Sequence, residues 1–218
     1  MDARQLRFGI AAGATALVSA ASASAQMPGA PVLQNAFVAP GFTGAIDFGS
    51  GAGSVYALAG GWAPGTARFQ LSGGVGFRKP TFGGSSTTYG VRASAPLFAM
   101  GQRFGLALFA GYGGASSAGA ADSLRTATEV PLGASLGFRQ VLGSTHGFSL
   151  YASPMWVHAT GASGRGSESL FRTSIGADAA LTGAIGLTVG AELGSSAKRI
   201  GPSGTRWGVA LSYALGHR

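Results

Sequence analysis

Apolar residues alternate with small or polar residues along most of the chain. The segment 205–215 shows this most clearly, because Trp207, Val209, Leu211 and Tyr213 alternate with Gly, Ala and Ser. A strand repeats every two residues and a helix every 3.6, so this period predicts β-strands. Ten segments follow the pattern, at 42–49, 55–62, 67–78, 87–98, 104–113, 128–140, 148–158, 170–181, 186–195 and 205–215. The first two are the weakest, which leaves eight strands as an alternative.

The composition of the polar face decides the environment of these strands. A solvated strand face carries Lys and Glu, whereas here it is mostly Gly, Ser, Ala and Thr. Such residues suit a narrow, crowded barrel interior, with the apolar face toward lipid. Most segments also have the roughly nine to eleven residues that a tilted strand needs to cross a bilayer. The pattern therefore favours an all-β, antiparallel, transmembrane up-and-down β-barrel over a soluble sandwich or lipocalin-like barrel.

Aromatic residues cluster near the strand ends, as in the interfacial girdles of membrane barrels. One expected row comprises Trp62, Phe69, Phe104, Phe148 and Tyr213, and the other comprises Phe77, Tyr89, Tyr112, Trp156, Phe171 and Trp207.

Charged residues on the strands fall on the face expected to line the interior. The expected charge network comprises Asp47, Arg68, Arg78, Arg92, Glu129, Arg139, Arg172, Asp178, Glu192 and Arg206. Charges in a confined interior are costly unless they are paired or hydrated. A salt-bridge network that fills the barrel is the first interpretation, with Arg206 at the exterior mouth and within reach of Glu192 on the preceding segment. A narrow pore that favours anions because arginine is in excess is the alternative.

The N-terminus has the pattern of a secretory signal. Arg4 and Arg7 precede a weakly apolar core, and Ala23-Ser24-Ala25 forms a small-residue cleavage site. We therefore expect a cleaved signal peptide at 1–25, an extended lead-in at 26–41 and the barrel at 42–218. No later segment is long and apolar enough to predict a membrane-spanning helix.

Overall composition narrows the function further. The chain has no cysteine, which excludes disulfides, thiolate metal sites and a cysteine nucleophile. The net charge is +8, but the arginines are spread singly and lysine occurs only twice, so no nucleic-acid-binding patch is expected.

The connections between segments alternate in length. Those at 63–66, 100–103, 142–147 and 182–185 are short, whereas those at 79–86, 115–127, 159–169 and 196–204 are mostly longer and polar. In bacterial barrels short turns face the periplasm and long loops face the exterior. The long loops are candidates for surface recognition, although flexible hydrophilic padding is the simpler interpretation.

With its signal peptide, alternating strands, aromatic girdles and closing strand 207–213, the chain resembles the small bacterial outer-membrane barrels of the OmpX, OmpA-barrel and opacity-protein group. The resemblance covers 42–215 and implies insertion by the barrel-assembly machinery. It departs from the family in its last residues, because Tyr213 is followed by five more residues instead of ending the chain. Members of this group include adhesins, structural anchors, narrow pores and a few enzymes.

Catalytic chemistry has little support in the sequence. His158-Ala159-Thr160 resembles only loosely the His-x-Ser pair of outer-membrane lipid deacylases, and no cluster has metal-ligand spacing. We therefore expect a monomeric, non-enzymatic structural or surface-exposed protein of the outer membrane, surrounded by lipid and without cofactor, metal or nucleic acid. A narrow pore for small solutes is the alternative, and a lipid-active enzyme comes third.

Overall fold

The described part of the computed structural model is a closed barrel of ten antiparallel strands. It covers residues 40–51, 53–65, 68–80, 84–100, 103–118, 124–142, 146–161, 166–194 and 206–215. The expected signal peptide at 1–25, most of the lead-in at 26–41 and the expected loop at 196–204 lie outside these ranges. Among the described residues, no helix is long and apolar enough to cross a membrane.

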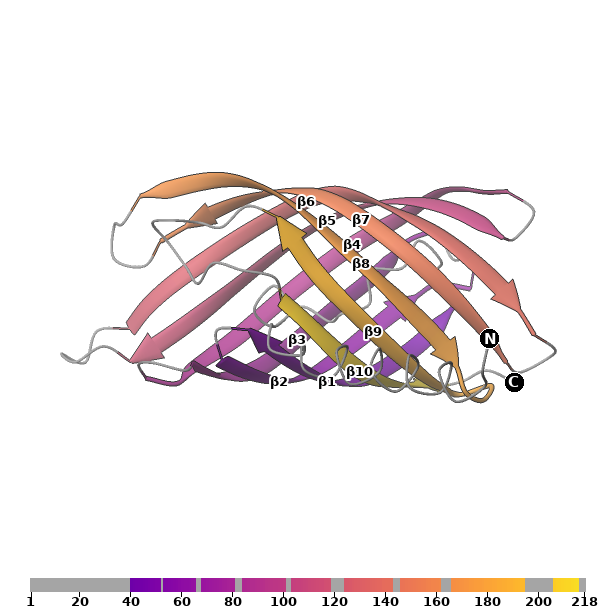
Figure 1. Cartoon of the computed structure of the whole chain (residues 1–218), viewed down its shortest axis with the longest axis horizontal. Helices are drawn as coiled ribbons and strands as arrows, with labels where there is room; N and C mark the ends of the chain where they lie inside the picture. The colour runs from indigo at the N-terminus through magenta and orange to yellow at the C-terminus, as the bar shows by residue number, and fades with distance from the viewer. Residues whose placement is uncertain are drawn as a thin grey trace, which may run out of the picture.

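Each strand forms a hairpin with the next one along the chain, and the strands run obliquely to the long axis of the molecule (Figure 1). They are β1 (Gly41–Gly51), β2 (Gly53–Ala63), β3 (Gln70–Pro80), β4 (Ser86–Met100), β5 (Phe104–Ala118), β6 (Leu124–Val141), β7 (Gly147–Thr160), β8 (Ser167–Ala180), β9 (Ile185–Gly194) and β10 (Arg206–Leu215).

The ring closes between the first strand and the last. β1 pairs with β10 from Phe42↔Leu215 to Ser50↔Trp207, so each described strand has a hydrogen-bonded neighbour on both sides. A closed ring leaves no strand edge to be covered. This confirms the predicted up-and-down topology and selects ten strands over eight, because both β1 and β2 are complete members of the ring.

The two faces of each strand differ in burial as predicted. On β7, Tyr151, Ser153 and Met155 are buried inside the barrel, whereas Leu150 and Trp156 are exposed on its outer surface. Alternate residues of β2 follow the same rule. The interior of the barrel is therefore its core, and the large exposed side chains form its outer surface.

The barrel has two distinct ends. The terminal end holds Phe42, Leu215 and the connections 64–69, 101–103, 142–146 and 181–184. The loop end holds the connections 52, 81–85, 119–123, 161–166 and 195–205.

Two boundaries differ from the sequence prediction at the loop end. The segments 115–127 and 159–169 were expected to be loops, but β5 continues to Ala118, β6 begins at Leu124, and β7 and β8 leave only 161–166 between them. These Ser-, Ala- and Gly-rich residues continue the backbone ladder, for example at Ser116↔Thr126 and Thr160↔Ser167. Small polar side chains gave no alternation to detect, yet their backbone groups pair like those of any strand.

The connection between β2 and β3 is longer than predicted. The segment 67–78 was expected to be a strand, but the ladder starts only at Gln70. Trp62 pairs with Leu71, and two residues after Trp62 comes Pro64, which has no backbone N–H to donate. Pairing therefore ends there, and Arg68 lies exposed in the turn.

A glycine comparison tests which face is packed. A Cβ added to Gly133 would lie 2.7 Å from Phe109 Cζ and 2.8 Å from Met155 Cβ, whereas one added to Gly44 meets nothing within 4 Å. Gly133→Ala should therefore lower the free energy of unfolding by about 1–3 kcal/mol through overpacking. The matched Gly44→Ala should change it by less than about 0.5 kcal/mol. Urea titration of the folded protein in detergent measures both, and equal effects would contradict the assignment of the faces.

Candidate functional site

The polar interior is the candidate site, and its most connected part lies near the loop end. Glu129 on β6, Arg172 on β8, Glu192 on β9 and Arg206 on β10 all belong to the inward-facing set of their strands. We call these four residues the mouth cluster. The register pairs Arg206 with Glu192 directly, and the closed ring brings Glu129 to them from the other side of the interior.

Arg172 is the centre of the mouth cluster. Its Nη1 donates to Glu192 Oε1 at 3.0 Å and to both carboxylate oxygens of Glu129 at 3.4 Å. Arg206 adds longer contacts, with Nη2 at 3.9 Å from Glu129 Oε1 and Nη1 at 3.8 Å from Glu192 Oε1. The reach of Arg206 to Glu192 is the one that the sequence predicts. Two carboxylates and two guanidinium groups balance in charge.

Burial makes this pairing obligatory. The side chains of Arg172 and Glu192 are 6% and 4% exposed. An ionised group taken out of water loses several kcal/mol of hydration, which only close, hydrogen-bonded partners offset. The cluster therefore ties β6, β8, β9 and β10 together across the interior and neutralises the charges that would otherwise be stranded there.

The middle of the barrel is filled by Arg92 on β4. Its guanidinium carbon lies 5.0 Å from the centre of the Phe109 ring on β5, a cation–π geometry. Arg92 is 4% exposed and is within electrostatic range of Tyr151 and Glu192. Asp47 on β1 is also completely buried. At this level side chains occupy the space that a water-filled channel would need.

A third polar layer lies toward the terminal end. Asp178 on β8 accepts hydrogen bonds from Thr188 Oγ1 at 2.6 Å and from Ser149 Oγ at 3.0 Å. Ser153 donates to Ser135 at 2.8 Å across β7 and β6. Hydroxyl groups of two neighbouring strands thus stabilise this half-buried carboxylate.

An apolar cluster shares the interior with these charges, and the sequence interpretation missed it. Its members are buried and come from β5, β7 and β8, namely Phe109, Met155, Val157, Ala159 and Leu170. On β7 both faces carry large apolar residues, so alternation of polarity could not separate them. The available signal is the position of Phe109 in the alternation along β5. Phe109 falls on the face opposite to that of the exposed Leu108 and Tyr112, so it points inward.

The remaining predicted charges take different places. Arg78 on β3 is half-buried near the mouth cluster, within electrostatic range of Arg206 and Glu129. Arg139 is half-buried close to the terminal end of β6. Arg68 does not join the interior at all, because it lies before the start of β3 and is exposed. The structure therefore brings the expected charges into separate layers, with Arg68 outside them.

The predicted girdle residues lie on the outer surface. Exposure exceeds one third of the side chain for Trp62, Phe77, Phe104, Tyr112, Phe148, Trp156, Phe171 and Tyr213, whereas Tyr89 and Trp207 are half-buried. Neighbouring rings contact each other along the rows, as in Trp62–Phe69 at 5.6 Å and Tyr89–Tyr112 at 6.3 Å between centroids. Each row therefore continues from strand to strand.

One pair of polar side chains lies on the outer surface near the loop end. His158 Nδ1 on β7 is 3.3 Å from Ser169 Oγ on β8, and both residues are exposed. The described carboxylates of β6 and β8, which are Glu129, Glu168 and Asp178, belong to the inward-facing set. A third, acidic member that would orient the imidazole is therefore not positioned on this face among the described residues.

Comparison with protein-family models finds no match, and comparison with curated protein sequences finds no significant match. Within the described part of the chain, no group of three or more His, Cys, Asp or Glu side chains could hold a metal ion. The interior contacts described above are ion pairs, hydrogen bonds from hydroxyl groups and apolar packing. Together they fill the interior of the barrel with side chains.

Removing one partner of the mouth cluster tests its role. Arg172→Met leaves Glu129 and Glu192 buried without their closest cation, so the free energy of unfolding should fall by about 3–5 kcal/mol. The double variant Arg172→Met/Glu192→Leu should recover a large part of this loss, because the stranded charge is removed as well. Arg68→Met is the exposed control and should have little effect. Urea unfolding of these variants and of the single variant Glu192→Leu measures this. A loss in the double variant equal to the sum of the two single losses would contradict a coupled pair.

Proposed function

We propose that the chain is an integral outer-membrane β-barrel protein with a non-enzymatic structural or surface-exposed role. It is exported by the expected signal peptide at 1–25, inserted by the barrel-assembly machinery and monomeric in the membrane. The observation that carries this proposal is the inversion of polarity, with charges inside the barrel and large apolar side chains outside it.

The outer surface supports a lipid environment. Leu58, Val75 and Phe171 are each about 60% exposed, and comparable residues occur on every strand around the ring. A soluble monomer rarely exposes contiguous apolar patches of more than a few hundred Å², and a larger patch marks contact with a membrane or a partner. In lipid the closed ladder also satisfies the backbone N–H and C=O groups that no water could reach.

The interior supports a structural role over a pore. Asp47 and Thr188 are inaccessible, and Arg92, Arg172 and Glu192 are at most 5% exposed, so side chains fill successive levels of the barrel. The four residues of the mouth cluster also balance in charge, which reduces the local arginine excess on which anion selectivity would depend to the neighbouring Arg78 among the described residues. A filled interior gives a rigid anchor for whatever the loop end presents.

The loop end supports a surface-exposed role. β6 is 18 residues long and β5 is 15, more than the nine to eleven or so that a bilayer requires. Their paired ends therefore project as an ordered hairpin on the side where long connections face the exterior in bacterial barrels. A rigid hairpin presents side chains for recognition at a lower entropy cost than a flexible loop.

Conductance in planar bilayers tests the closed barrel. The wild-type protein should insert and give no discrete current steps, because Arg92 and its neighbours occupy the interior. Triple replacement of the filling side chains, Arg92→Ala/Phe109→Ala/Tyr151→Ala, is the positive control and should give steps. Regular steps from the wild type that change with Arg92→Ala would contradict the proposal and support the pore.

Lipid hydrolysis tests the non-enzymatic role. The His158–Ser169 pair has no acidic partner on its face in the described residues, so fatty-acid release from phospholipid or lipopolysaccharide should stay at the background rate. His158→Ala and Ser169→Ala should be indistinguishable from the wild type in this assay. Release by the wild type that either substitution abolishes would make the protein a lipid-active enzyme.

A further inference from the structure

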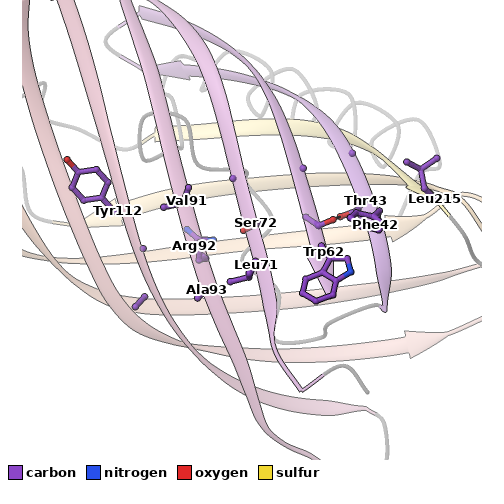
Figure 2. A pocket seen from close by; sticks show the side chains of 16 residues that line it. Phe42, Thr43, Trp62, Leu71, Ser72, Val91, Arg92, Ala93, Tyr112 and Leu215 are labelled. Carbon is purple, nitrogen blue, oxygen red and sulfur yellow. Dashed lines mark hydrogen bonds between the residues drawn. The ribbon is translucent and has the colours of Figure 1, made fainter. Parts of the chain in front are cut away.

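An apolar groove crosses the outer surface of β1 to β5 (Figure 2). Its volume is about 850 Å³, within the range of about 300–1,000 Å³ found for small-molecule pockets. The outward-facing residues that line it are Phe42, Gly44, Gly60, Trp62, Leu71, Gly73, Val91, Ala93, Ala110, Tyr112 and Leu215.

The floor of the groove is a row of paired glycines. Gly44 pairs with Gly60 and Gly60 pairs with Gly73, so three adjacent strands present bare backbone at the same level. Phe42, Trp62 and Leu71 form the neighbouring row toward the terminal end. The row on the other side is formed by Ile46, Leu58 and Val75, all exposed. The glycines therefore lie in a trough between two apolar ridges.

Packing of the barrel does not require glycine at two of these three positions. A Cβ at Gly44 would meet nothing within 4 Å, and one at Gly60 would meet only the Thr43 carbonyl oxygen at 3.7 Å, an ordinary contact. Neither residue has a positive φ. The interior Gly133 differs, because a Cβ there would collide with Phe109 and Met155. Gly44 and Gly60 therefore leave room on the outside of the barrel, whereas a Cβ at Gly73 would lie 3.2 Å from the Gly90 carbonyl oxygen.

The groove runs from the terminal end up the barrel wall. Phe42 and Leu215 form the last pair of the β1–β10 ladder at that end. At its other end the groove reaches Tyr112. This residue lies eight residues after Phe104, where β5 begins at the terminal end of the barrel. A long, narrow apolar ligand would fit along this path with one end at the barrel rim. An extended acyl chain has this shape.

Positive charge accompanies the groove at its rim. Arg68 is exposed in the β2–β3 turn, next to Phe69, whose ring contacts Trp62 at 5.6 Å. Arg103 is exposed in the β4–β5 turn. Neither turn contains an acidic residue, and the turns 142–146 and 181–184 on the other strands contain no Arg, Lys, Asp or Glu. Cationic turns at this end therefore occur only on the strands that carry the groove.

We propose that this groove binds an anionic glycerophospholipid, with an acyl chain along the glycine floor and the phosphate at Arg68. The inference rests on the proposed membrane location. A second copy of the chain fits less well, because two concave faces related by a two-fold axis would leave the trough empty between them. The coincidence of groove and cationic turns favours a ligand with one anionic end and one long apolar end.

Quenching of tryptophan fluorescence by brominated lipids tests the proposal. The variant Trp156→Phe/Trp207→Phe keeps only Trp62, which lines the groove. The variant Trp62→Phe/Trp207→Phe keeps only Trp156, which is exposed on β7, five strands from β2 in either direction around the ring. Each is placed in phosphatidylcholine vesicles with either brominated phosphatidylglycerol or brominated phosphatidylcholine as the minor lipid.

Quenching of Trp62 should show that the brominated anionic lipid is preferred about fivefold over brominated phosphatidylcholine. This ratio corresponds to the roughly 1 kcal/mol that one arginine contributes near a membrane surface. Trp156 should show no such preference. Arg68→Gln should abolish the preference at Trp62, whereas Lys79→Gln, an exposed cation at the loop end, should not. Gly44→Leu/Gly60→Leu should abolish it by filling the groove, and heat-dependent gel mobility verifies that this variant is folded.

Equal quenching preferences at Trp62 and Trp156 would overturn the lipid site while leaving membrane insertion intact. An effect of Lys79→Gln as large as that of Arg68→Gln would also overturn it, because the attraction would then be diffuse. Absence of quenching at both tryptophans by either lipid would instead refute the membrane location itself.

Discussion

The ladder between β1 and β10 is the interaction on which the rest of the barrel depends. Without it the sheet would have two open edges, and in lipid each unpaired N–H or C=O would cost several kcal/mol. Closure also fixes the positions of side chains that are distant in sequence. Glu129 meets Arg206 only because β10 is held against β1 and the ring is complete. Backbone pairing thus creates the interior in which the charges find their partners.

A ten-strand ring has little interior space, and the chain fills it by matching large side chains with glycines. Tyr151 pairs with Gly176, where any Cβ would collide with the phenol ring, and Gly133 leaves room for Phe109. Interiors of small barrels commonly combine large and small residues in this way. The same close fit explains why Arg92 can lie over an aromatic ring instead of in water. The interior is therefore set by volume as much as by charge.

The sequence was sufficient to predict the strands and their up-and-down order because period-two alternation and short hairpin connections are local features. It predicted the ten strands and the contact between Arg206 and Glu192. It failed where the polarity of the residues carried no signal. Because β7 has large apolar residues on both faces, the alternation does not reveal the cluster around Met155. The small residues at the ends of β5 and β6 predict a loop, although they belong to the strands. Arg68 falls on the same side of the alternation as the inward-facing residues of β3. The alternation alone, however, cannot show at which residue the hydrogen-bonded ladder begins. That boundary depends on the backbone of Pro64, which directly follows the end of the neighbouring strand β2.

Glycine has two physical roles in this barrel, and the distinction separates internal packing from outward function. At Gly133 and Gly176 the absence of a side chain is required by a neighbour inside the barrel, so these residues serve the fold. At Gly44 and Gly60 no neighbour requires it, and glycine costs backbone entropy and packs poorly in a strand. A residue that weakens its strand and relieves no internal contact leaves room for something outside the protein. The coincidence of this vacant surface with the Arg68 and Arg103 turns makes an amphipathic anion the ligand class that best fits both features.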